Sequence, residues 1–71
     1  MCRDVVVVFG FWESEAVHLV AVASDEADGR DIAARAAATG DFDRVEVRRV
    51  PVGVVHNCWD LPGSFVSEVT P

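Results

Sequence analysis

The sequence contains no lysine and no tyrosine, and all of its basic side chains are arginine. Six Arg stand against twelve Asp and Glu, which gives a formal net charge of −6. Because an acidic surface repels phosphate backbones, we expect no nucleic-acid partner. The use of arginine in place of lysine is typical of proteins encoded by high-GC genomes, as is the excess of Ala, Val, Asp and Gly in the sequence. We therefore predict a high-GC bacterium, or a phage of one, as the source.

Cysteine is scarce as well, with only Cys2 and Cys58 in 71 residues. A disulfide scaffold of this size would need more pairs, so we expect two reduced thiols that are not bonded to each other. No run approaches the roughly 20 apolar residues that span a bilayer, and no amino-terminal segment has the pattern of a leader. We expect no membrane association and a cytoplasmic location, which would be the host cytoplasm for a viral protein.

Hydrophobic residues are abundant, at 51% of the chain. Residues 5–12 are β-branched or aromatic on both alternating faces, which predicts a central strand covered on each side. Residues 16–23 continue as a second strand, with Val17, Leu19, Ala21 and Ala23 on one face. Neither face of either strand is clearly polar. A single small core therefore cannot bury all the apolar side chains of these two strands.

Residues 25–38 have the pattern of a helix. Ser24 can cap its amino end, acidic residues fill the first turn, and Gly40 can supply the left-handed conformation that ends it. The predicted packing stripe is almost entirely small: Gly29, Ile32, Ala33, Ala36 and Ala37. Such a helix must pack close to its sheet and buries little area there, so it cannot stabilise the fold alone.

Residues 44–52 alternate apolar and charged side chains and predict a third strand. The expected fold is α+β, a β-β-α-β unit of residues 1–52 whose three-stranded antiparallel sheet has the order 2-1-3. One helix covers this sheet. The largely buried side chains should be Val7, Phe9, Leu19, Ile32, Val45 and Val47.

Residues 53–71 form a carboxy-terminal arm in this interpretation. The arm carries large apolar side chains, whereas disordered tails are poor in them. We expect it to be an interaction or assembly element, with its anchors at Trp59, Leu61, Phe65 and Val66. These anchors can pack on a neighbouring subunit or on the open sheet face of their own chain, and the sequence does not separate the two.

Residues 20–28 contain the sequence Val-Ala-Val-Ala-Ser-Asp-Glu-Ala-Asp, in which a strand leads into a capped helix start. With this segment, residues 5–50 resemble small uncharacterised β-β-α-β proteins of bacteria and their phages. The resemblance implies the fold of about two thirds of the chain, and it transfers no catalytic residue.

Few side chains are grouped in a way that supports chemistry. His56, Cys58 and Asp60 would project to one side of an extended segment and could ligate a metal or form a Cys-His pair, but their spacing matches no established metal pattern. Acidic pairs fall in predicted turns or at the helix start, and the glycines form no phosphate-binding loop. We predict no catalytic residues, no cofactor and no resident metal.

The basic residues Arg44, Arg48 and Arg49 lie among Asp41, Asp43 and Glu46. This mixture favours cross-strand ion pairs or a protein contact over a nucleic-acid site.

These observations favour a non-enzymatic protein-interaction module that self-associates into a homo-oligomer. One alternative is an acidic inhibitor or host-takeover factor, which would bind a host protein through Asp25, Glu26, Asp28 and Asp31. Another is a small metal-binding protein that uses His56 and Cys58.

Overall fold

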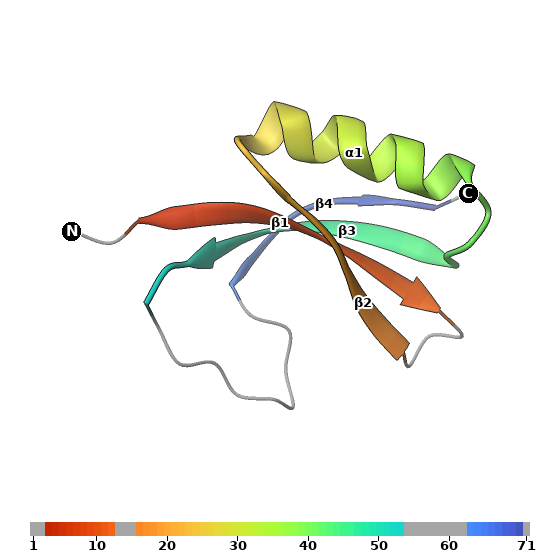
Figure 1. The fold of residues 1–71 in the computed structure, drawn as a ribbon, viewed down its shortest axis with the longest axis horizontal. Coiled ribbons are helices and arrows are strands. Elements are labelled where there is room, and N and C mark those ends of the chain that lie inside the picture. Colours follow the sequence, from red (N-terminus) through yellow and green to blue (C-terminus); the bar gives the residue numbers. More distant parts are fainter. Residues whose placement is uncertain (1–2, 13–15, 54–62, 71) are drawn as a thin grey trace.

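A computed structural model describes residues 3–12, 16–53 and 63–70. The order of elements is β1 (Asp4–Trp12), β2 (Ala16–Ala23), α1 (Glu26–Ala38), β3 (Arg44–Pro51) and β4 (Ser64–Val69). The four strands form one sheet in the order β2-β1-β3-β4, and all neighbouring pairs are antiparallel. The helix lies across one face of this twisted sheet (Figure 1).

The prediction of an α+β fold with β1 between β2 and β3 is confirmed, but the prediction of only three strands is wrong. The fourth strand comes from the carboxy-terminal arm and pairs with the outer edge of β3. Gly63 precedes it with φ of 76°, and a Cβ there would lie 2.1 Å from the Arg49 carbonyl oxygen. A glycine is therefore required where the chain joins the edge of β3.

The helix begins one residue later than predicted, and its N-cap is Asp25 rather than Ser24. The backbone N–H of Asp28 donates to Asp25 Oδ1 at 2.8 Å, while the backbone N–H and hydroxyl of Ser24 donate to Asp28 Oδ2 at 3.1 and 3.2 Å. These reciprocal bonds satisfy donors at the helix start, as in a capping box. At the other end, Gly40 has φ of 79°, which confirms the predicted left-handed termination.

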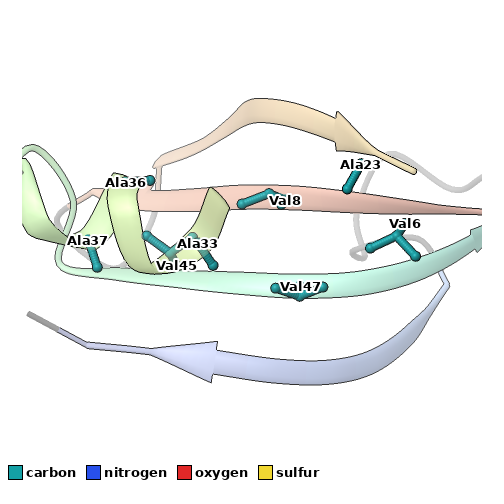
Figure 2. Packing of buried hydrophobic residues seen from close by; sticks show 8 residues of the cluster. All are labelled: Val6, Val8, Ala23, Ala33, Ala36, Ala37, Val45 and Val47. Atoms are coloured by element: carbon teal, nitrogen blue, oxygen red, sulfur yellow. The ribbon is translucent and has the colours of Figure 1, made fainter. Parts of the chain in front are cut away.

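The core lies between the helix and the sheet, and Figure 2 shows the small side chains that form it. It consists of Val6, Val8, Ala23, Ala33, Ala36, Ala37, Val45 and Val47. Gly29 allows the close approach, because a Cβ at this position would lie 2.7 Å from Val6 Cγ1 and 3.0 Å from Val47 Cγ1. The predicted small-residue stripe is thus confirmed, although Ile32 is only half-buried at its margin.

Three of the six predicted core residues, Phe9 and Leu19 as well as Ile32, are less buried than predicted. Val7, Val45 and Val47 are buried as predicted, whereas Phe9 is half-buried and Leu19 is 64% exposed. A bulge at Val20 is the reason for the exposure of Leu19: Phe9 pairs with Leu19 but Val8 pairs with Ala21. The extra residue reverses the alternation within β2, so that Ala21 and Ala23 face the helix while Val17 and Leu19 face away from it.

In the part of the chain that the structure describes, no helix has the length and apolar character needed to cross a membrane.

Candidate interaction surface

The sheet face opposite the helix is termed the open face, and its β1–β2 half is apolar. Register places the side chains of β1 and β2 that point away from the helix side by side. The residues of this apolar half are Val7, Phe9 and Phe11 of β1 and Val17, Leu19 and Val22 of β2. The described helix is on the other side of the sheet (Figure 1).

Burial differs sharply between these two strands. Val7 and Phe11 of the central strand are only 6% and 3% exposed, and the Arg44 guanidinium lies over the Phe11 ring. On β2, Leu19 is 64% exposed, Val22 61% and Val17 43%. The outer strand of the sheet therefore offers a row of large aliphatic side chains on its open face.

The β3–β4 half of the open face is charged and internally paired. Arg48 Nη1 lies 3.0 Å from Glu46 Oε1, and Arg44 Nη2 lies 3.2 Å from Glu46 Oε2. Arg44 Nε also lies 3.4 Å from Oε1 of Glu68 on β4. Glu46 is only 6% exposed, and the two guanidinium groups offset the cost of burying its carboxylate.

Arg44 joins the two halves of the open face. Its guanidinium carbon stands 3.9 Å from the centroid of the Phe11 ring, which is a cation–π contact. The Arg44 Nε atom is buried and lacks a hydrogen-bond partner of good geometry, although the Glu68 carboxylate is near. The guanidinium thus covers Phe11 and lies between the apolar half and the acidic side chains.

The charges of the open face sum to zero, although the chain carries −6. Its described strands contribute two guanidinium groups, of Arg44 and Arg48, and two carboxylates, of Glu46 and Glu68. Arg49 points to the helix side, where it bonds the Glu26 carboxylate. The three clustered arginines of the sequence are therefore divided between two faces. The predicted cross-strand pairing is found for Arg44 with Glu68, whereas Arg48 pairs with Glu46 of its own strand and Arg49 with Glu26 of the helix.

The predicted anchors of the arm are only partly placed. Phe65 pairs with Arg48 across β3 and β4, which puts it on the open face, where it is 58% exposed. Val66 occupies a bulge in β4 and is half-buried against the core. Trp59 and Leu61 lie outside the described residues, as do His56, Cys58 and Cys2. The predictions made for those residues stay predictions.

The acidic side chains of the helix start have local partners. Asp25 and Asp28 form the cap, Asp31 pairs with Arg35 at 3.1 Å, and Glu26 binds Arg49. The hydrogen bond and positive charge of Arg49 lower the pKa of Glu26, and the carboxylate correspondingly raises the pKa of Arg49. These contacts give the acidic row a role in stabilising the helix and its junction with β3.

Within residues 3–12, 16–53 and 63–70, no group of three or more His, Cys, Asp or Glu side chains could hold a metal ion. Sequence reasoning recognised surplus apolar surface on the first two strands but assigned Leu19 to the core. The exposed row of β2 was missed because the sequence gives no signal for the bulge at Val20.

The chain matches no protein-family model, no curated protein and no solved structure. Its likeness to small β-β-α-β proteins therefore stays a prediction from the sequence.

Proposed function

We propose that this protein is a non-enzymatic interaction module that self-associates through the open face of its sheet. The single observation that carries the proposal is the exposed aliphatic row of Val17, Leu19 and Val22 on β2. Exposed apolar side chains occur singly on most surfaces, but a contiguous row on one strand marks an interaction surface. Phe65, on the same face at the other edge of the sheet, extends the apolar contact.

The size of the open face suits a protein partner. A standard interface buries about 800 Å² on each partner, which is about a sixth of the 4780 Å² surface of this chain. Apolar burial contributes about 25 cal/mol for each Å², before the entropy cost of association is subtracted. An open face that lies opposite the helix (Figure 1) can make such a contact without any rearrangement of the helix side.

The charge distribution favours a second copy of this chain as the partner that binds the open face. Two chains of net charge −6 repel each other over most of their surfaces, but the open face is neutral and its charges are already paired. In a two-fold arrangement the same patch of each subunit meets itself. The aliphatic strips then form the dry centre of the interface, and the Arg44–Glu68 side of the face forms its polar rim.

This proposal revises how the arm takes part. β4 pairs with β3 of its own chain, so the contact between subunits is assigned to a sheet face rather than to the β3 edge. Phe65 remains a contact residue, and Trp59 and Leu61 remain predicted anchors.

A pair of charged substitutions tests the proposal. Leu19→Glu combined with Val22→Glu places two carboxylates in the centre of the interface and should convert the oligomer into monomers. The matched control carries two carboxylates on exposed helix positions, Ala34→Glu with Ala27→Glu, and should keep the mass of the parent protein in sedimentation velocity. The proposal is wrong if both double variants sediment like the parent.

A further inference from the structure

A hollow lies on the helix side of the sheet, beyond the carboxyl end of α1. Its lining residues are Trp12 of β1, His18 of β2, and Asp41 and Phe42 of the segment after the helix. Its volume is about 330 Å³, which is at the lower end of the range for small-molecule sites, about 300 to 1,000 Å³. The hollow is separate from the open face, because Trp12 and His18 belong to the opposite face of β1 and β2.

Three rings form the walls of this hollow without stacking on one another. The centroids of Trp12 and His18 are 6.0 Å apart with an interplanar angle of 51°, and those of His18 and Phe42 are 6.4 Å apart with an angle of 52°. Tilted rings at these distances leave part of each π-face free for a ligand. Trp12 remains 54% exposed, which is a large apolar exposure at the entrance.

One ring of the hollow packs against the backbone of the sheet. Phe42 lies against Gly10, where an added Cβ would come within 2.4 Å of two of its ring carbons. His18 pairs with Gly10 across β1 and β2, so it is the strand neighbour of the residue on which the Phe42 ring lies. A ring held by the sheet backbone loses little freedom when a ligand binds, which favours affinity.

The electrostatics of the hollow favour a cation. Ring faces carry negative quadrupole potential, and Asp41 supplies a full negative charge at the wall. Asp41 also follows the helix cap Thr39 by two residues, so the hollow is near the negative end of the helix. The ion pairs between described residues engage the side chains of Arg30, Arg35, Arg44, Arg48 and Arg49 elsewhere.

We propose that the hollow binds a small quaternary ammonium cation, with its methyl groups against Trp12 and Phe42 and its charge balanced by Asp41. The apolar walls favour this class over a primary ammonium, because N–H groups that lose water without gaining acceptors are costly to bury. A quaternary ammonium has no N–H group to satisfy, and aromatic surfaces recognise this class of cation. This site is independent of the self-association proposed above.

The test compares choline with its uncharged isostere, 3,3-dimethyl-1-butanol, by following the Trp12 indole resonance of the full chain in an NMR titration. Choline should bind with a dissociation constant on the order of 1 mM, as expected for so small a ligand. The neutral isostere should bind about tenfold more weakly, since it keeps the shape but loses the attraction of the charge to the rings and to Asp41. Equal affinity of the two compounds, or no shift with choline at tens of millimolar, would overturn the proposal.

Two substitutions locate the site. Trp12→Leu removes the indole, so its titration is followed at the backbone amide resonance of Phe42. This variant retains an apolar wall without a π-face and should weaken choline binding about tenfold, with little change for the isostere. Asp41→Asn should weaken choline binding several-fold, whereas Asp31→Asn, which makes the same change in net charge on the helix, should leave it unchanged. A parent-like affinity in both Trp12→Leu and Asp41→Asn would show that choline binds elsewhere.

Discussion

The ring of Phe42 lies directly on Gly10 of the central strand, and this contact fixes the chain between the helix and β3. A Cβ at position 10 would stand 2.4 Å from ring atoms Cδ1 and Cε1 and 2.9 Å from Cγ. Because Cγ is close to the backbone of Phe42, a rotation of the ring alone cannot remove the clash. Gly10 is required here for space and not for an unusual backbone conformation, since its φ is not positive.

Gly10→Ala should therefore destabilise the fold by about 1 to 3 kcal/mol, the usual cost of overpacking. Chemical denaturation gives this value. Phe42→Ala removes the ring and makes room, so Gly10→Ala should cost much less in that background, and the double-mutant cycle should show strong coupling. Additive effects would mean that the ring does not rest on position 10 in solution.

The burial of the core predicts the relative cost of two truncations. Val47 is fully enclosed, with 0% exposure, whereas Ile32 is half-buried at the edge of the helix. We expect Val47→Ala to cost about 2 to 3 kcal/mol, from two lost methyl groups and the cavity they leave. Ile32→Ala removes more atoms but should cost less, about 1 to 2 kcal/mol, because that site is partly open to water. The reverse order in denaturation experiments would contradict the described packing of the helix.

The contact between Glu26 and Arg49 predicts an acid dependence. Arg49 lowers the pKa of Glu26 below its ordinary value of 4.5 through a hydrogen bond and its charge. The lower folded-state pKa means that this contact stabilises the fold above pH 4.5 and is lost as the pH falls through the folded value.

Arg49→Gln should raise the pKa of Glu26 toward 4.5 in an NMR titration of its carboxyl carbon. The difference in Tm between the parent and Arg49→Gln should be largest near pH 6 and should shrink under strongly acidic conditions. Arg35→Gln breaks a different exposed pair, with Asp31, and serves as the control that leaves the pKa of Glu26 unchanged. A Glu26 pKa that is insensitive to Arg49→Gln would contradict the contact.

Residue patterns and turn signals predicted the bounds of β2 and of the helix more accurately than they predicted which side chains face the core. β2 begins and ends at the predicted residues, the helix is displaced by one residue at its start, and the small stripe from Gly29 to Ala37 packs as expected. The N-cap was misassigned because Ser24 and Asp25 are both good caps, and the sequence alone does not show which side chain turns toward Asp28.

The features that the sequence did not reveal arise from bulges and from long-range pairing. Bulges at Val20 and Val66 interrupt the alternation of β2 and β4, so Leu19 was assigned to the core and residues 64–69 to an arm. The aromatic hollow combines Trp12, His18 and Phe42 across 30 positions of sequence. The register of β1 and β2 brings Trp12 and His18 together, and the packing of Phe42 on Gly10 adds the third ring. Local propensity carries no information about such contacts.

The central claim is that the open face joins two copies of this chain, and the mass of the unmodified protein in solution tests it most directly. Sedimentation equilibrium is run at a series of loading concentrations in the micromolar range. The apparent mass should rise with concentration toward at least twice the 7.7 kDa of one chain. A mass of 7.7 kDa that stays constant into the millimolar range would contradict the account.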